Sequence, residues 1–139
     1  MNSVAKEKIN YKSAGVDIDA GNEAVDRIKD GVKSTFTSNV LTGLGSFGSL
    51  YDLKPILENY DHPVMVQSID GVGTKTIIAR KMKKFDTIGI DLLSAAANDI
   101  LVMGARPLTF LDYIANDKLR PKIVEEIVSG MVKACKETG

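Results

Sequence analysis

The fold expected for this chain follows mainly from residues 64–75, which read Val64-Met-Val-Gln-Ser-Ile-Asp-Gly-Val-Gly-Thr-Lys75. The first part is short, apolar and rich in residues that favour β-structure, which predicts a strand over residues 64–69. The strand delivers Asp70, and two glycines and a Thr-Lys pair then lead into an expected helix. Proteins of the α/β class place ligands at such strand ends. The segment therefore predicts an α/β fold with a candidate site at residues 70–75.

Further elements are expected on both sides of this segment. Apolar residues at helical spacing predict helices over residues 22–32, 75–84, 87–103 and 121–136, with a helical turn at 54–60. Pro121 suits the first turn of the last helix, and Gly104 can cap the end of the helix before it. Strands are expected at 49–53, 64–69 and 107–115. In the helix at 75–84, we expect Ile77, Ile78 and Met82 to face inward.

This order of elements predicts an α+β sandwich within the α/β class. Helices would cover one face of a mixed sheet of about four strands. Residues 1–20 are polar and predict an N-terminal arm, followed by one domain over residues 21–139. The predicted strands are few for a closed sheet, so we expect a partner to complete it.

The amino-acid composition excludes several classes of protein. The 139 residues, 44% hydrophobic and 26% charged, are typical of one globular domain with a real core. Equal numbers of basic and acidic residues argue against a nucleic-acid binder. No apolar run approaches the ~20 residues of a membrane helix. The single cysteine and single histidine argue against an internal disulfide or a zinc cluster. We therefore expect a cytoplasmic protein that binds neither nucleic acid nor membrane.

A glycine-rich loop, Gly43-Leu-Gly45-Ser-Phe-Gly48, matches the pattern G-x-G-x-x-G. The dinucleotide-binding form of this pattern follows a buried strand and opens a helix. Here the preceding residues are polar and a strand is expected afterwards, which disfavours a dinucleotide-dependent oxidoreductase. Glycines also let backbone N–H groups approach phosphate oxygens. A flap over phosphates and a flexible surface loop therefore both stay open.

The residue types at 70–75 are those that bind Mg²⁺ and phosphate. A carboxylate such as Asp70 suits Mg²⁺, which prefers hard oxygen ligands together with a substrate phosphate. The following helix N-terminus offers N–H donors to an anion, and Lys75 can neutralise phosphate charge. The alternative is a tight turn in which Asp70 caps the helix.

The helix expected at 87–103 is apolar nearly all round, which predicts that it is buried. Its few polar residues include Asp91, Ser94 and Asn98 on one narrow stripe, with Asp99 beside it. A buried carboxylate is costly unless it is paired, so Asp91 and Asp99 are expected to have partners. A metal ion shared with Asp70 would satisfy Asp99; a salt bridge or a helix cap is the alternative.

Several motifs of the chain together resemble a known family. They are Tyr11-Lys-Ser-Ala-Gly-Val-Asp-Ile-Asp-Ala-Gly21, the loop at 43–48, Asp70-Gly-Val-Gly-Thr-Lys75, Asp86-Thr-Ile-Gly-Ile-Asp91, Asn98-Asp-Ile100, Gly104-Ala-Arg-Pro107 and Phe110-Leu-Asp-Tyr113. From residue 11 to residue 139 the sequence resembles the N-terminal part of phosphoribosylformylglycinamidine cyclo-ligase, also called aminoimidazole ribonucleotide synthetase. The motifs at Asp70 and Asn98 are shared with a wider superfamily, and the segment 11–21 points to the cyclo-ligase within it.

The resemblance implies an enzyme of purine biosynthesis, an ATP-dependent ligase that forms a C–N bond. It would close formylglycinamidine ribonucleotide to aminoimidazole ribonucleotide and release ADP and phosphate. The family resemblance also implies a homodimer whose N-terminal sheets pair into a barrel. ATP and Mg²⁺ are the implied cofactors, with Asp70 and Asp99 as the Mg²⁺ carboxylates. The ATP contacts that the resemblance implies are Lys29, Gly43, Gly45, Gly48, Asp70, Gly71, Val72, Gly73, Thr74, Lys75, Asp91 and Asn98.

The family has a C-terminal domain that is absent from these 139 residues. That domain contributes to the substrate cleft, so the chain alone is expected to bind nucleotide weakly and to be inactive. No catalytic residue is assigned. Two other functions stay open, a non-catalytic dimerisation or nucleotide-binding module and a sister kinase such as selenide-water dikinase or thiamine-monophosphate kinase.

Overall fold

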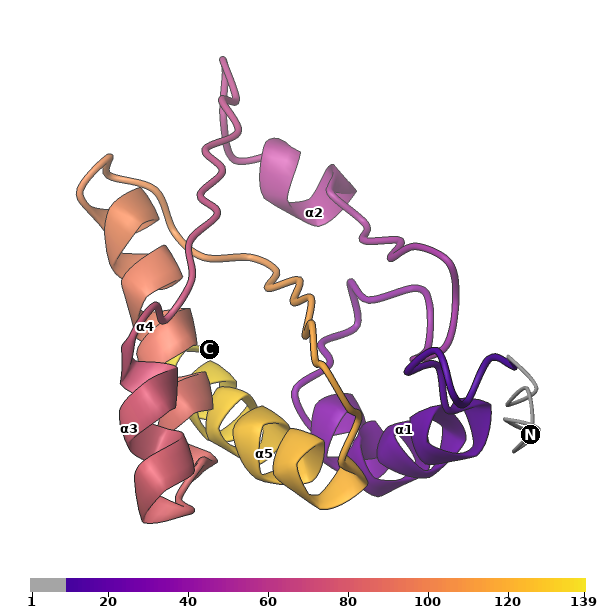
Figure 1. Ribbon diagram of the computed structural model, residues 1–139. Helices are drawn as coiled ribbons and strands as arrows, with labels where there is room; N and C mark the ends of the chain where they lie inside the picture. The colour runs from indigo at the N-terminus through magenta and orange to yellow at the C-terminus, as the bar shows by residue number, and fades with distance from the viewer. Residues whose placement is uncertain (1–9) are drawn as a thin grey trace, which may run out of the picture.

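A computed structural model describes residues 10–139 of the chain. Its regular elements are α1 (Ile18–Lys33), α2 (Lys54–Leu57), α3 (Lys75–Met82), α4 (Asp86–Leu101) and α5 (Pro121–Thr138). Helix α5 lies between α1 and α4, and α3 packs against α4 (Figure 1). The long connections over residues 34–74 and 104–120 arch over one side of these helices. Helices α1, α5, α4 and α3 thus form a layer, and the connections, with α2 in the first of them, lie on one side of it.

Helix α5 supplies most of the core. Its buried apolar residues Val124, Val128, Met131 and Ala134 recur at helical spacing, as the sequence predicts. Ala24 of α1 joins this core. The partly buried side chains packed against it are Ile28, Val32, Leu92, Phe110, Ile114, Leu119, Ile127 and Val132. The helix expected at 121–136 is therefore confirmed, and it organises the packing of the others.

Helices α4 and α5 cross at two glycines. A Cβ atom added at Gly89 would collide with the Ile127 carbonyl oxygen and lie 2.6 Å from the Met131 nitrogen. A Cβ atom added at Gly130 would collide with the Asp86 carbonyl oxygen. Both positions are buried. Because each added Cβ atom would meet backbone atoms of the other helix, the two backbones are in direct contact where the helices cross. No side chain larger than hydrogen fits at either position in this arrangement.

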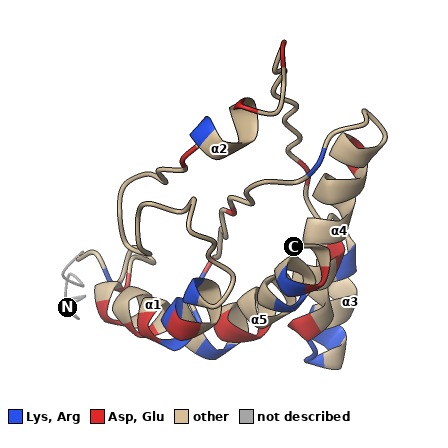
Figure 2. Ribbon diagram, turned by 180° about the vertical axis from the view of Figure 1, so that it is seen from behind, with Lys and Arg blue, Asp and Glu red and all other residues tan. Residues whose placement is uncertain are grey.

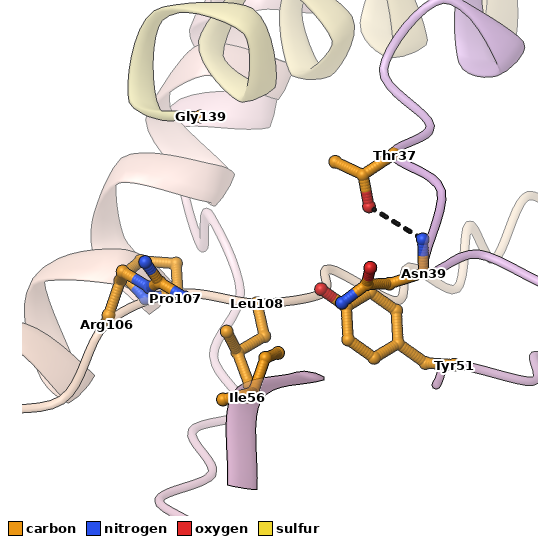
Figure 3. A pocket seen from close by; sticks show the side chains of 8 residues that line it. All are labelled: Thr37, Asn39, Tyr51, Ile56, Arg106, Pro107, Leu108 and Gly139. Carbon is orange, nitrogen blue, oxygen red and sulfur yellow. Dashed lines mark hydrogen bonds between the residues drawn. The ribbon is translucent and has the colours of Figure 1, made fainter. Parts of the chain in front are cut away.

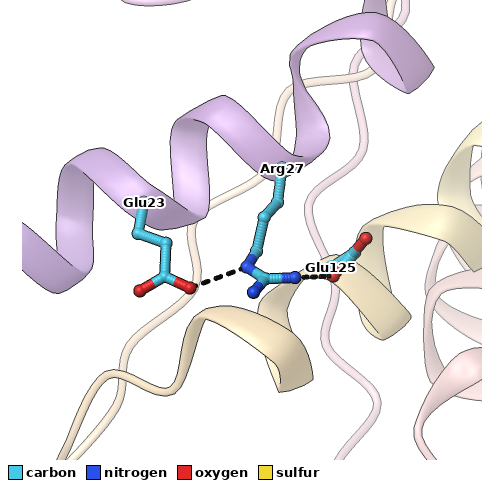
Figure 4. Close-up of polar contacts among 3 residues, drawn as sticks. All are labelled: Glu23, Arg27 and Glu125. Atoms are coloured by element: carbon cyan, nitrogen blue, oxygen red, sulfur yellow. Dashed lines mark hydrogen bonds and ion pairs between the residues drawn. The ribbon is translucent and has the colours of Figure 1, made fainter.

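Helix α1 begins at Ile18 rather than at residue 22 because Asp17 caps it. The Asp17 Oδ1 atom accepts a hydrogen bond from the Ala20 amide at 3.2 Å. Further along, Arg27 joins α1 to α5 by donating to Glu23 and Glu125, at 2.9 Å in each case (Figure 4). These three side chains are substantially exposed, so their ion pairs join α1 to α5 but contribute little to stability.

The end of α4 confirms the predicted role of Gly104. This residue has a φ of +76°, a left-handed conformation that glycine adopts readily. The Gly104 amide donates to the Leu101 carbonyl at 2.9 Å, and the Ala105 amide donates to the Ile100 carbonyl at 3.1 Å. This pair of bonds is a Schellman motif, which satisfies carbonyl groups that the helix leaves open.

The predicted mixed sheet of about four strands is wrong for this chain. Among the described residues, the β-pairing consists of one isolated antiparallel bridge, between Val40 and Tyr51. The segments 64–69 and 107–115 form no ladder, and Ile69 is 99% exposed. A helix satisfies its backbone groups locally, whereas a strand needs a neighbouring strand. The apolar patterns of these segments are present, but the described part of the chain offers them no partner strand.

Two predictions of burial are also wrong. Ile77, Ile78 and Met82 of α3 do not face inward; they are 53%, 60% and 67% exposed, and Ala79 is the buried residue of this helix. Helix α4 is not buried all round, because α5 covers only the side that carries Ile88, Gly89 and Leu93. Charged residues gather along α1, α3 and α5, and the arching connections carry few of them (Figure 2).

Candidate functional site

The segment 68–75 runs alongside α4 and is tied to it at both ends. The Ser68 hydroxyl donates a hydrogen bond to the Asp99 carboxylate at 2.8 Å. The Lys75 ammonium forms an ion pair with the Asp91 carboxylate at 2.9 Å. Since Ser68 precedes Lys75 while Asp99 follows Asp91, the segment runs antiparallel to the helix. Asp70, Gly71, Val72, Gly73 and Thr74 lie between these two attachments.

The turn before α3 has a defined local geometry. Asp70 Oδ1 accepts a hydrogen bond from the Gly71 amide at 2.6 Å. Gly73 has a φ of +57°, where a glycine is favoured. Thr74 is the N-cap residue of α3, although its side chain makes no capping bond. The alternative in which Asp70 caps this helix is therefore wrong, and its carboxylate faces the turn instead.

Asp91 and Asp99 both have partners, as the sequence predicts, although neither is buried. The side chains of Lys75 and Asp91 are 62% and 45% exposed, which makes their ion pair a weak one. Asp99 and Asn98 are exposed near the end of α4. The stripe of polar residues thus faces the segment 68–75 and solvent rather than a closed interior.

The donor set beside α4 fits Mg²⁺ that arrives with a nucleotide. Mg²⁺ is usually held by one or two carboxylates, with waters and phosphates as the other ligands. Asp70 and Asp99 supply carboxylates from two neighbouring segments, and Lys75 supplies a positive charge. Within residues 10–139, no group of three or more Asp, Glu, His or Cys side chains is arranged to hold a metal ion by itself.

The other predicted ATP contacts lie elsewhere. Lys29 belongs to α1, which packs against α5 and not against α3 or α4. The loop at 43–48 is closed by the bridge between Val40 and Tyr51, and by a bond of 3.0 Å from the Leu50 amide to the Thr42 hydroxyl. A Cβ atom at Gly43, Gly45 or Gly48 would meet nothing within 4 Å. This loop is open to solvent, and none of its hydrogen bonds joins it to the segment 68–75.

Sequence reasoning did not select Ser68 as a site residue. A usable signal was present, because alternate residues of an extended segment point to the same side. Ser68 precedes Asp70 by two positions and is the polar residue nearest to it on that side. Its contact with Asp99 links residues that are 31 positions apart, a pairing that spacing along one sequence does not reveal.

A separate shallow hollow of about 220 Å³ lies under the arching connections (Figure 3). Its lining consists of Thr37, Asn39, Tyr51, Ile56, Arg106, Pro107, Leu108 and Gly139. None of the predicted ATP or Mg²⁺ residues is among them. The hollow is therefore not the predicted nucleotide site.

The sequence matches a known protein family over more than half of its length. The family described as "AIR synthase related protein, N-terminal domain" matches residues 55–139, which contain Asp70, Lys75, Asp91 and Asp99. The chain belongs to this family. None of the helices in residues 10–139 combines the length and apolar character needed to cross a membrane.

Relatives of this AIR synthase domain match nearly the whole chain. Proteins from Carboxydothermus hydrogenoformans and Brevibacillus brevis are each 52% identical to it, over 131 and 129 residues, or 94% and 93% of the chain. One from Leptospira interrogans is 50% identical over 131 residues, 94% of the chain. All three are named phosphoribosylformylglycinamidine cyclo-ligase. The chain spans 37–38% of the length of these relatives.

Proposed function

We propose that this chain is the ATP-binding N-terminal part of a phosphoribosylformylglycinamidine cyclo-ligase. The observation that carries the proposal is the identity of 50–52% to relatives with this name, over 93–94% of the chain. The reaction would be the ATP-dependent closure of formylglycinamidine ribonucleotide to aminoimidazole ribonucleotide in purine biosynthesis. We also propose that the protein is cytoplasmic.

The chemistry of the proposed reaction explains why a phosphate-binding site is needed. ATP would phosphorylate the formyl oxygen, and ADP would be released. A neighbouring nitrogen would then attack the formyl carbon, and phosphate would leave from that carbon. Bound Mg²⁺ would offset negative charge on the phosphates of ATP. Asp70 and Asp99 are the proposed Mg²⁺ ligands. Lys75 would contact phosphate after exchanging its present partner, Asp91, for the nucleotide.

The proposed partners are a second copy of the chain and the ribonucleotide substrate. Val64, Met65, Ile69, Leu111 and Tyr113 are between 74% and 99% exposed, and a second copy would cover them. Because the chain spans only 37–38% of its relatives' length, the remaining part would contribute to the substrate cleft. We therefore expect the chain alone to bind nucleotide without turnover.

Calorimetry of ATP binding with and without Mg²⁺ tests this function. The unsubstituted chain is expected to bind ATP saturably when Mg²⁺ is present. Asp70→Asn removes a proposed ligand charge and should strongly weaken this binding. Asp61→Asn is the matched control, because Asp61 is an exposed loop carboxylate outside residues 68–75 and forms no ion pair with any described residue. If the chain binds no ATP, or if both variants bind as the unsubstituted chain does, the proposed nucleotide site is wrong.

A further inference from the structure

We propose that Ser68 is a positioning residue that orients the Asp99 carboxylate for Mg²⁺. This inference rests on the proposed function, because it concerns the same nucleotide site. It adds a residue that neither the motif at Asp70–Lys75 nor the pair Asn98-Asp99 contains. The decisive contact is the 2.8 Å hydrogen bond from Ser68 Oγ to Asp99 Oδ2.

Asp99 needs an external group to fix its side chain. It lies in the second half of α4, where the helix dipole does not favour a negative charge. It is exposed, and it has no ion pair with any described residue. An unrestrained carboxylate at such a position would sample several rotamers. The hydrogen bond from Ser68 selects one of them.

The bond leaves Asp99 able to bind a cation. A carboxylate has about four lone-pair sites on its two oxygens, and the Ser68 hydroxyl uses one of these, on Oδ2. No other described residue donates a hydrogen bond to Asp99. The remaining sites are therefore open to Mg²⁺. Hydrogen bonds of this kind orient metal-binding carboxylates, and their loss typically weakens metal affinity by about 10–100-fold.

Ser68 also couples the two proposed ligands. It is partly buried, while the two residues that follow it, Ile69 and Asp70, are exposed. Alternation along the extended chain places Ser68 and Asp70 on the same side of the segment. Attaching Ser68 to Asp99 therefore holds the backbone two residues before Asp70 against α4. One hydroxyl thereby restrains the chain next to Asp70 and the carboxylate of Asp99 together.

The test is calorimetry of ATP binding by the 139-residue chain as the Mg²⁺ concentration is varied. Ser68→Ala is expected to raise the Mg²⁺ concentration that gives half-maximal ATP binding about tenfold or more. Ser68→Thr keeps a hydroxyl and is expected to restore most of the affinity. Ser129→Ala is the matched control, since its hydroxyl bonds only within α5, to the Glu126 carbonyl. Circular dichroism would verify that each variant is folded.

A double substitution separates positioning from a general effect on stability. In an Asp99→Asn background the carboxylate is already absent, so Ser68→Ala should add little further loss of Mg²⁺ dependence. Equal Mg²⁺ dependence of the unsubstituted chain and Ser68→Ala would overturn the inference and leave the proposed function intact. Additive losses would overturn it in the same way. Absence of any Mg²⁺-dependent ATP binding by the unsubstituted chain would instead overturn the proposed function, and the inference with it.

Discussion

Among single residues, Lys75 is expected to matter for ATP binding and to contribute little to stability, although it forms an ion pair with Asp91. Both side chains are largely in solvent, so the pair contributes no more than about 1 kcal/mol to folding. Lys75→Met should therefore hardly change the free energy of unfolding in urea. A hydrogen bond to a charged group contributes about 1.5–3 kcal/mol, so the same change should weaken Mg²⁺-dependent ATP binding about tenfold or more.

The matched control for Lys75 is Lys81, which lies on the same helix and forms no ion pair with any described residue. Lys81→Met should leave ATP affinity unchanged. An equal loss in the two variants would show that the effect is one of overall charge. Unchanged binding in Lys75→Met would remove Lys75 from the nucleotide site.

Asp17 predicts a pH dependence of stability. The hydrogen bonds from the Lys12 ammonium and the Ala20 amide hold the pKa of its carboxyl below the ordinary value. A carboxyl with a lowered folded-state pKa stabilises the fold above its unfolded-state pKa, and this contribution is lost as the pH falls through the folded-state pKa. Asp17→Asn keeps a capping oxygen but removes the charge, so it should lower the melting temperature near pH 7 and have a smaller effect at acidic pH, near pH 3.

The comparison variant Asp17→Ala removes both the charge and the cap, so it should lower the melting temperature at both pH values. Thermal unfolding followed by circular dichroism measures these differences. If Asp17→Asn shifts the melting temperature equally at the two pH values, the charge of Asp17 has no part in stability.

At the scale of elements, the crossing of α4 and α5 depends on Gly89 and Gly130. An added methyl group at either position would collide with the backbone of the other helix. Overpacking of this kind costs about 1–3 kcal/mol, which exceeds the gain of up to about 1 kcal/mol that alanine brings to a helix. Gly89→Ala and Gly130→Ala should therefore each lower the free energy of unfolding in urea.

Gly31 is the control for this prediction, because it also lies in a helix but an added methyl group fits beside it. Its added Cβ atom would lie 3.7 Å from Val132 Cγ2, an ordinary contact. Gly31→Ala should leave the free energy of unfolding unchanged or raise it by up to about 1 kcal/mol. Similar destabilisation in all three variants would argue against a direct backbone crossing.

The same elements show what local sequence patterns can predict. The apolar stripe of α5, its Pro121 start and the Gly104 cap of α4 depend on neighbours within a few positions, and all three are confirmed. The sheet depends on strands pairing across the chain, and that prediction is wrong. The crossing glycines carry no local signal either, because only the approach of another backbone distinguishes them from other helical glycines.

At the candidate site, too, the sequence predicts what depends on near neighbours but not the contacts between distant segments. The sequence predicts that Asp91 and Asp99 have partners, because carboxylates on an apolar helix are costly when unpaired. Their partners, Lys75 and Ser68, come from a segment that lies against α4 only in three dimensions. Lys29 and the loop at 43–48 remain untested predictions, and α1 does not contact α3 or α4.

At the scale of the whole molecule, the exposed apolar side chains predict self-association. The segments 64–69 and 107–115 present Val64, Ile69, Leu111 and Tyr113, all at least 76% exposed. We expect sedimentation equilibrium to give twice the chain mass of 15.0 kDa. Tyr113→Lys should shift this equilibrium toward the monomer, because burying a lysine in the proposed interface is unfavourable. Ile18→Lys is a control on α1; equal behaviour of the two variants would contradict an interface at these segments.

Nucleotide is proposed to bind where the segment 68–75 lies against α4. Two-dimensional NMR of the isotopically labelled chain, titrated with ATP in the presence of Mg²⁺, tests it most directly. The largest changes in amide chemical shift are expected at residues 68–75, 91 and 98–99. Changes confined to the hollow around Arg106, or to α1 and the loop at 43–48, would contradict it.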